Sequence, residues 1–535
     1  MQPDERLAVI DLGSNSFRLV VFTVHDGWWK RTDEIYEPVR IGEGLAASGR
    51  LGEKPIERAL ATLDVFAHFC RAAGLEGGSI DAVATSAIRD AGNAAEFLER
   101  AGRLTGLPIR VLSREAEARY GYLAAINSTT LAEGCVLDLG GGSLQLVRVA
   151  ERLALQSGSW SLGAVRMTER FLPPNGPAKR KQMEELREYV ARELAQASWL
   201  AESGRRLVGI GGTVRSLATA AQRAAGLPSN GVQGMVIERE ALDELVERLA
   251  ALPVAERSSI PGIKPARADL ILAGAIVVQG VLDAGGFDGL EATEAGLREG
   301  VFFERLLGGS RPAEPPGPGA STRPLLFGDL RRTSVMNLAT RYDVDAAHTR
   351  HVAALALGMF DELSRLGLHP GDARERELLW AACMLHDIGM SVDYDDHHKH
   401  SRYLILNGGL PGFTPVEVAT IAQAARYHRK GMPDPGPLAA LFEVEDKARL
   451  NRCAVLLRLA EDLERSRDQL VRGVDLSLLD GKPDGDGEVQ PAGGGAGAVQ
   501  LRLIADGEAA VPRWAASRET ELFARAFHHD LSVAA

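Results

Sequence analysis

A ten-residue motif occurs twice in the first 150 residues, and its residue types suit a phosphate and a hydrated cation. Residues 11–20 (DLGSNSFRLV) align without a gap on residues 138–147 (DLGGGSLQLV). Each copy follows one apolar segment and leads into another, which predicts a strand, a tight Gly/Ser turn and a returning strand. Such a turn points backbone N–H groups at an anion. Two of them facing each other across a cleft would clamp a phosphate chain with its Mg²⁺.

Either turn alone could be an ordinary Asp-Gly hairpin, but the gapless repeat favours two half-sites of one cleft. We therefore expect Asp11 and Asp138 to hold the waters of Mg²⁺. Residues of the two turns would hold the phosphate oxygens, namely Ser14, Asn15, Gly140, Gly141, Gly142 and Ser143.

Two other segments, in which a strand pattern runs into a helical one, could add phosphate contacts. Arg89, in residues 84–93 (ATSAIRDAGN), would bring its planar guanidinium near a helix N-terminus, although it could also be a surface arginine. The Gly turn in residues 209–215 (GIGGTVR) could serve a third phosphate contact or only close packing; its candidate residues are Gly211, Gly212 and Thr213. A basic track, or merely a solvated face, could be formed by Lys179, Arg180, Lys181, Arg205, Arg206 and Arg215.

The elements that must position these residues form an α/β pattern. Strand patterns at 81–86, 109–112 and 207–210 alternate with helical ones, including helices expected at 179–201 and 239–251. Because the motif repeats, we expect two similar lobes, residues 1–125 and 126–307, with the active cleft between them. Residues 308–324 are mostly Gly, Pro, Ser and Thr and predict a linker.

The rest of the chain has a different pattern. Residues 325–480 are predicted to form a helical domain, and a second glycine-rich stretch, 481–498, separates it from a short tail. In this α+β tail, which ends at residue 535, a strand is expected at 499–503 and a helix at 518–527.

Composition narrows the class of protein. The chain has 61 Lys and Arg residues and 72 Asp and Glu residues, so its net charge is negative. A negative net charge disfavours general binding to nucleic acid, so we expect no nucleic-acid partner. The N-terminal residues lack a basic and apolar leader pattern, and the apolar run 270–278 is too short to span a bilayer. The four cysteines are widely spaced, which suits a reducing compartment. We therefore expect a cytoplasmic protein with no membrane partner.

Seven ordered segments resemble the exopolyphosphatase and guanosine pentaphosphate phosphatase (Ppx/GppA) family of the actin-like superfamily. They are DLGSNSFRLVV, ATSAIRDAGN, SREAEARYGYL, DLGGGSLQLV, GIGGTVRSLA, PGIKPARADLILAG and TEAGLREGVF. The resemblance spans residues 7 to about 305. It implies two ribonuclease-H-like lobes, Mg²⁺-dependent hydrolysis of the terminal phosphate of inorganic polyphosphate, and a homodimer.

The resemblance also changes the interpretation of one helix. From the residues alone, the acidic side chains after the expected N-cap Ser113 are explained by the helix dipole. The family's general base is the Glu that precedes Ala-Arg in this segment, which is Glu117 here. Glu117 would then orient or deprotonate the attacking water, Asp138 would assist catalysis through the metal, and Arg89 would neutralise phosphate charge.

One residue departs from the family pattern. Gln145 stands where the family usually has Glu after the second glycine turn, in the expected Mg²⁺ site. A glutamine contributes no negative charge to a metal, so cation affinity or rate would be reduced, and Gln145→Glu should strengthen the Mg²⁺ dependence.

Eight of the twelve histidines fall between residues 348 and 428. Around His386-Asp387 the sequence resembles the HD phosphohydrolase domain that these phosphatases often carry. The resemblance implies a possible second divalent-metal site formed by His348, His386, Asp387 and Glu461, the last standing where Asp is usual. A vestigial HD fold with packed histidines is the alternative.

The sequence leaves several functions open. The leading one is an exopolyphosphatase, and its closest rival is the 5′-phosphohydrolase of guanosine-5′-triphosphate,3′-diphosphate (pppGpp) on the same site. A kinase of the same superfamily is disfavoured by the Glu117 segment. A regulator that binds polyphosphate or an alarmone (pppGpp or ppGpp) with low turnover is a non-enzyme alternative.

Overall fold

The computed structural model describes residues 5–228, 230–308, 325–479, 482–483, 489–490 and 497–534. The chain divides into two compact units, Met1–Leu330 and Arg331–Ala535, which we call unit 1 and unit 2. The predicted linker, apart from Gly308, lies outside the described residues, as does most of the glycine-rich stretch at 481–498.

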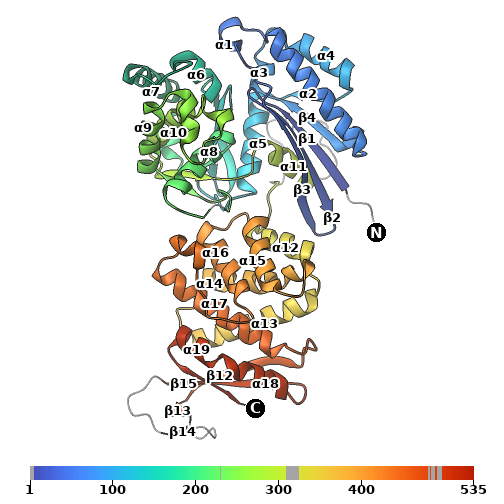
Figure 1. The fold of residues 1–535 in the computed structure, drawn as a ribbon, viewed down its shortest axis with the longest axis vertical. Helices are drawn as coiled ribbons and strands as arrows, with labels where there is room; N and C mark the ends of the chain where they lie inside the picture. Colours follow the sequence, from blue (N-terminus) through green and yellow to red (C-terminus); the bar gives the residue numbers. More distant parts are fainter. Residues whose placement is uncertain are drawn as a thin grey trace. The chain divides into compact units, whose positions relative to one another are not determined.

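The first lobe of unit 1 is built on a mixed sheet in the order β3-β2-β1-β4-β5. β1 is antiparallel to β2 and parallel to β4, and β2 is antiparallel to β3. Its strands are β1 (Glu5–Leu12), β2 (Phe17–His25), β3 (Trp28–Glu37), β4 (Ile80–Ala84) and β5 (Ile109–Val111). Its helices are α1 (Leu45–Ser48), α2 (Glu53–Ala72), α3 (Ser86–Arg89) and α4 (Ala94–Thr105). In Figure 1, α2 and α4 run along one side of this sheet.

The second lobe repeats this topology. Its sheet has the order β10-β11-β9-β6-β7-β8, and β6 is antiparallel to β7 and parallel to β9, as β1 is to β2 and β4. The strands are β6 (Gly134–Leu139), β7 (Leu144–Ala150), β8 (Leu153–Trp160), β9 (Arg206–Ile210), β10 (Val236–Glu238) and β11 (Gly289–Ala292). The helices are α6 (Ala164–Phe171), α7 (Arg180–Leu194), α8 (Gly212–Ala224), α9 (Arg239–Ala251) and α10 (Ile271–Gly285). The ten-residue repeat is therefore part of a duplicated supersecondary structure.

Two helices join the lobes through a shared core. α5 (Arg114–Ile126) and α11 (Leu297–Gly308) pack against each other, α5 also contacts β6 and β7, and α11 contacts β1. β1 alternates between two cores, since Ala8 and Ile10 face the α2 and α4 side while Leu7 and Val9 face the α5 and α11 side. Burial of both strand faces explains its nearly continuous apolar sequence.

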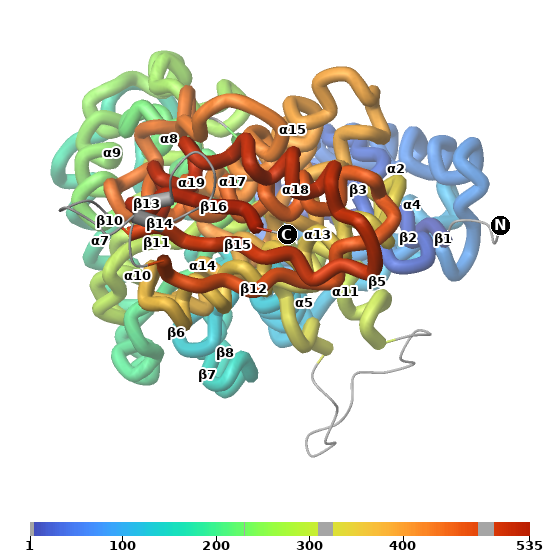
Figure 2. Tube along the Cα trace, turned by 90° about the horizontal axis from the view of Figure 1, so that it is seen from below, coloured from blue at the N-terminus to red at the C-terminus, as the bar shows by residue number. Residues whose placement is uncertain are grey.

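Unit 2 contains a helical bundle and a small sheet. The helices are α12 (Leu330–Tyr342), α13 (Ala346–Arg365), α14 (Ala373–Leu385), α15 (His397–Gly408), α16 (Pro415–Arg426), α17 (Val444–Leu463), α18 (Ala510–Ala516) and α19 (Thr520–Phe527). The sheet has the order β12-β15-β16, with β12 (Val471–Leu479), β15 (Ala498–Ala505) and β16 (Asp530–Ala534) side by side in Figure 2. A separate pair is formed by β13 (Lys482–Pro483) and β14 (Val489–Gln490).

The boundaries in unit 2 differ from the sequence prediction of an all-α domain with a separate tail. β12 lies inside the segment predicted to be helical and pairs along its length with β15. Leu476, Leu501 and Phe523 belong to the same hydrophobic core as the helices. The tail is thus part of unit 2, because its alternating strand needs β12 as a partner and the helices as a cover.

Within the described residues, no helix combines the length and the apolar character needed to cross a bilayer. The apolar run at 270–278 lies in α10, whose side chains are buried in the core of the second lobe.

Candidate active site

The repeated motif forms two equivalent turns at the ends of equivalent strand pairs. In the β1–β2 turn Gly13 N donates to Ser16 O at 3.2 Å, and in the β6–β7 turn Gly140 N donates to Ser143 O at 3.0 Å. Each turn follows an aspartate at the end of the preceding strand. The sequence match therefore corresponds to a match in local geometry.

The two turns lie against each other. Ser86, the first residue of α3, lies beside the first turn, and its hydroxyl oxygen is 3.1 Å from that of Ser14. A Cβ added to Gly141 would lie 3.1 Å from the Ser14 Cβ of the first turn, and one added to Gly142 would lie 3.0 Å from the Ser14 Oγ and 2.5 Å from the neighbouring Ser86 Oγ. Glycine is needed here because a side chain would separate the turns.

A cavity of about 130 Å³ lies where the turns meet. The structure brings many of the predicted site residues to its wall, namely Asp11, Ser14, Asn15, Glu117, Asp138, Gly140, Gly141, Gly211, Gly212 and Thr213. Four predicted residues, Arg89, Gly142, Ser143 and Gln145, are absent from its described lining.

Three carboxyl groups face this cavity, of which Glu117 is buried and Asp11 and Asp138 are partly buried. Burial raises the pKa of Asp11, partly offset by Arg298, and burial also raises the pKa of Glu117. The pKa of Asp138 rises to about 7, because burial is reinforced by the charges of Glu117 and Asp11. A cation between these groups would relieve their repulsion.

The carboxylates fit a hydrated Mg²⁺. Mg²⁺ prefers oxygen ligands and is usually held by one or two carboxylates, several waters and substrate phosphates, so a closed set of protein ligands is not required. Asp11 and Asp138 supply such oxygens from the two lobes. The donor set therefore suits the ion that the sequence predicts.

Arginines supply the opposite charge. The cavity lining includes Arg18, Arg215, Arg267 and Arg298. Burial, together with the nearby Arg298 and Arg18, lowers the pKa of Arg215 to about 10. Burial also lowers the pKa of Arg18 and of Arg267. Partly buried cations that repel one another favour a bound anion.

Sequence reasoning missed three of these arginines, although one could have been found. Arg18 lies within the repeated motif at the position equivalent to Gln145, and each stands opposite the motif's aspartate in its hairpin. Arg267 and Arg298 come from segments far along the chain. Arg298 Nη1 donates to Asp11 Oδ2 at 3.1 Å and so ties α11 to the first turn.

Glu117 is held by residues on both sides of it. Its helix begins at Ser113, whose Oγ accepts from Ala116 N at 3.1 Å. Arg89 Nη1 donates to Glu117 Oε2 at 2.6 Å, and Ser143 Oγ donates to Glu117 Oε1 at 3.4 Å. The structure thus places Arg89 on the carboxylate, where it orients Glu117, rather than on the cavity wall as expected for a phosphate ligand.

Gln145 lies one layer behind the cavity. Its Nε2 donates to Ser143 Oγ at 2.9 Å and to Ser159 Oγ at 3.4 Å. Among the described residues, its Oε1 has no hydrogen-bond partner. Gln145 therefore acts on Glu117 through Ser143, and its absence from the described lining differs from the expected direct role in the Mg²⁺ site.

The third glycine turn also reaches the cavity. Gly211, with φ of +98°, leads from β9 into α8, whose first residues Gly212 and Thr213 line the cavity. A side chain on Gly212 would collide with the guanidinium of Arg267. The N-terminus of α8 and this arginine together suit a phosphate group.

The proposed basic track is not a continuous feature. Arg180 and Lys181 pair with Glu184 and Glu185 on the exposed face of α7. Arg205 pairs with Asp288, and Arg206 with Glu291. Lys179 precedes α7 as its N-cap residue. Of this set, only Arg215 is among the described cavity residues. The paired residues of the set contribute to the solvated surface.

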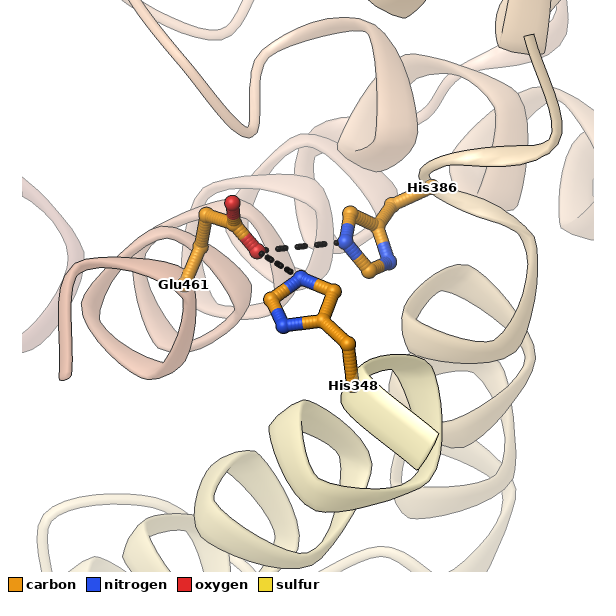
Figure 3. Close-up of side chains that lie close together, drawn as sticks. All are labelled: His348, His386 and Glu461. Carbon is orange, nitrogen blue, oxygen red and sulfur yellow. Dashed lines mark hydrogen bonds and ion pairs between the residues drawn. The ribbon is translucent and has the colours of Figure 1, made fainter. Parts of the chain in front are cut away.

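The predicted metal ligands of unit 2 also lie together. Glu461 Oε2 is 3.0 Å from His348 Nε2 and 3.2 Å from His386 Nε2, as Figure 3 shows. Asp387 is adjacent, with its Oδ1 3.7 Å from His386 Nε2. His348 comes from α13, Glu461 from α17, and His386 and Asp387 follow the end of α14.

The duplicated sheets and facing glycine turns define a two-lobed, actin-like protein with a phosphate-suited cleft. Solved structures share this architecture. The Aquifex aeolicus Ppx/GppA family member is 31% identical, with a TM-score of 0.50, over 58% of this chain and 100% of that one. An exopolyphosphatase-like protein is 28% identical, with a TM-score of 0.51, over 56% and 96%. A Cytophaga hutchinsonii exopolyphosphatase, at 21% identity and a TM-score of 0.53 over 57% and 98%, shows the same fold.

The chain belongs to the Ppx/GppA phosphatase family. The family model matches residues 20–308, and the model of Ppx/GppA phosphatase domain III matches residues 330–484. The protein is accordingly a hydrolase that acts on phosphoanhydride bonds. The C-terminal match names domain III of this family, so the resemblance to an HD domain stays a prediction.

Proposed function

We propose that the protein is an exopolyphosphatase that releases orthophosphate from the end of inorganic polyphosphate in a Mg²⁺-dependent reaction. The observation that carries this proposal is the presence, in one cavity, of Asp11, Asp138 and Glu117 together with four arginines. Phosphoryl transfer needs this combination, because catalysis depends on positioning water and offsetting phosphate charge.

Glu117 is the residue that handles the attacking water. Glu117 lines the cavity. Arg89 Nη1 donates to its Oε2 at 2.6 Å and so fixes the orientation of the carboxylate. The raised pKa caused by burial makes this carboxylate a stronger base. It orients the water in line with the terminal phosphorus and accepts its proton.

Asp11 and Asp138 would hold Mg²⁺, which supplies charge neutralisation on the phosphate oxygens. The turn N–H groups of Ser14, Asn15 and Gly141 hold oxygens of the terminal group. Arg215, Arg267 and the N-terminus of α8 hold the phosphates that follow, and their charge stabilises the leaving chain.

The cavity favours a linear polyanion over a guanosine nucleotide. Its described lining contains arginines, small residues and carboxylates but no aromatic side chain on which a guanine could stack. The same reacting group occurs in pppGpp, so its 5′-phosphohydrolysis is the second candidate. The third candidate is a polyphosphate- or alarmone-binding regulator with low turnover. It is supported by Gln145, which lacks the negative charge of the Glu that the family usually has at this position.

A substrate comparison tests the proposal. Orthophosphate release is measured from long-chain polyphosphate and from pppGpp at matched Mg²⁺ and enzyme concentrations. We expect the larger kcat/KM with polyphosphate. A larger value with pppGpp supports the nucleotide phosphatase, and tight polyphosphate binding with negligible release supports the regulator. Light scattering on the same preparation tests the predicted homodimer.

A further inference from the structure

Unit 2 contains a cluster of buried metal-ligating side chains larger than the set that the sequence predicts. It consists of four histidines and two carboxylates, His348, His386, Asp387, His397, His428 and Glu461. They form two groups, and within each group the ligand atoms lie within 4.8 Å of one another. We propose that this cluster binds two divalent transition-metal ions, one at His348, His386 and Glu461 and one at Asp387, His397 and His428.

The distances in the second group match the edges of a metal coordination polyhedron. His397 Nε2 lies 3.1 Å from His428 Nε2 and 3.2 Å from Asp387 Oδ1, and His428 Nε2 lies 3.7 Å from the same oxygen. Ligands about 2.0–2.1 Å from a tetrahedral ion are about 3.3 Å apart. The first group has similar separations of 3.0 and 3.2 Å between its carboxylate oxygen and its two Nε2 atoms, drawn in Figure 3.

Backbone carbonyls fix the tautomer of three of the histidines. The Nδ1 atoms of His386, His397 and His428 lie 2.6, 2.8 and 2.7 Å from the carbonyl oxygens of Cys383, Tyr394 and Ala425. A carbonyl oxygen only accepts, so each Nδ1 carries a proton. In the neutral ring the lone pair is then on Nε2, the atom that faces the cluster. This is the arrangement by which an outer carbonyl prepares a histidine for metal binding.

The protein atoms alone do not satisfy the hydrogen bonding of His397 Nε2, His428 Nε2 and Asp387 Oδ1. With both Nδ1 atoms protonated, the Nε2 lone pairs of neutral His397 and His428 face each other at 3.1 Å. Asp387 Oδ1, on a side chain that is 2% exposed, has no hydrogen-bond partner among the described residues. An extra proton would satisfy the histidine pair but leave this oxygen unpartnered. A cation between the three atoms satisfies all of them.

Asp387 connects the two groups. Its Oδ1 belongs to the second group, and its Oδ2 lies 3.9 Å from His348 Nε2 in the first. Arg467 Nη2 donates to the same Oδ2 at 2.8 Å and holds the carboxylate in place. Imidazole ligands suit Zn²⁺, Cu²⁺, Fe²⁺ or Ni²⁺, whereas the oxygen ligands of the cleft suit Mg²⁺. The proposed centre is therefore chemically distinct from the phosphatase site.

Cobalt binding by the full-length protein tests the proposal. Chelator-treated protein is reloaded with Co²⁺, freed of excess metal by gel filtration and analysed for bound cobalt and its visible absorption. We expect two ions per chain with the spectrum of imidazole-bound Co²⁺. His348→Gln and His428→Gln should each retain one ion, and the double variant none.

Two controls separate this centre from other sites. His400→Gln, on the same helix as His397 but outside the cluster, should retain two ions. Asp11→Asn combined with Asp138→Asn should also retain two, whatever its effect on phosphatase activity. Fewer than two tightly bound ions in the wild type, or an unchanged count in the folded His348→Gln and His428→Gln double variant, overturns the proposal. The wild-type count is valid even if a variant fails to fold.

Discussion

At the scale of single residues, the environment of Glu117 favours the proposed catalytic role over a role that only complements the helix dipole. It occupies the first turn of α5, where either role is reasonable. The neighbouring Glu115 is exposed, whereas Glu117 is 5% exposed and paired with Arg89. Burying a charged carboxylate costs desolvation free energy, which an exposed carboxylate such as Glu115 avoids while still complementing the helix dipole. The burial and pairing of Glu117 therefore favour a functional role.

Arg89 is predicted to be a positioning residue. Arg89→Met removes the partner that lowers the pKa of Glu117, so this pKa rises further above its usual value. Because the ionised carboxylate is the active form, the acidic limb of the rate profile should move to higher pH. We expect kcat at pH 7 to fall at least about tenfold, with KM little changed.

The control for Arg89→Met is Arg103→Met, which breaks an exposed ion pair with Glu99 on α4. It should leave the profile unchanged. A pH profile of kcat on protein verified as folded by circular dichroism provides the measurement. An acidic limb that stays in place would show that Arg89 does not act through Glu117.

At the scale of elements, the close approach of the two hairpin turns is the feature on which the cleft depends. Gly142→Ala places a methyl group 2.5 Å from the Ser86 Oγ and 3.0 Å from the Ser14 Oγ of the first turn, and so pushes the second turn away from the first lobe. Misplacing reacting groups by about 1 Å costs up to about a hundredfold in rate, so we expect a loss of at least tenfold in kcat/KM. Orthophosphate release measures this loss.

Gly102→Ala is the matched control, since it lies within α4 and a Cβ there meets nothing within 4 Å. It should keep full activity and gain slightly in stability. Equal activity of Gly142→Ala and the wild type would mean that the turns need not touch.

Glu417 lies in the first turn of α16 and links this helix to α12 and α14. Burial alone would raise its pKa, but hydrogen bonds from Arg374 and Arg331 outweigh burial and lower it to about 2. Arg331 contacts both carboxylate oxygens at 3.0 Å. Because the pKa is lowered on folding, its contribution to stability is present above the usual pKa of 4.5 and is lost as pH falls toward 2.

We therefore expect Glu417→Gln to lower the free energy of unfolding by about 2 kcal/mol at pH 7. The difference from the wild type should shrink as the pH falls from 4.5 toward 2. Denaturant titrations over this range measure it, with Glu362→Gln, which removes a surface pair with Arg365, as a control of small effect. A difference independent of pH would contradict the pKa assignment.

The sequence predicts local elements well because their determinants are local. The apolar run of β1 and the Gly/Ser turn that follows it lie within one short segment, and the structure has both where expected. Arg267 and Arg298 could not be placed on the cavity, since their positions depend on how distant segments pack. The same reason explains the second metal group, because His397 and His428 meet Asp387 only through the packing of α15 and α16.

At the scale of the whole molecule, the two units have separate hydrophobic cores. One core spans residues 335–531, and the others lie within residues 7–327. We expect calorimetry to resolve two unfolding transitions, with Glu417→Gln lowering the temperature of only one. A single transition that shifts as a whole would show that the units unfold together.

In the proposed mechanism Glu117 activates water at a cleft built from the two glycine turns. Its most direct test is orthophosphate release from long-chain polyphosphate by the wild type and Glu117→Gln, each with and without Mg²⁺. We predict Mg²⁺-dependent release by the wild type and at least about a hundredfold slower turnover by the folded variant. Equal release by the two proteins would contradict the account.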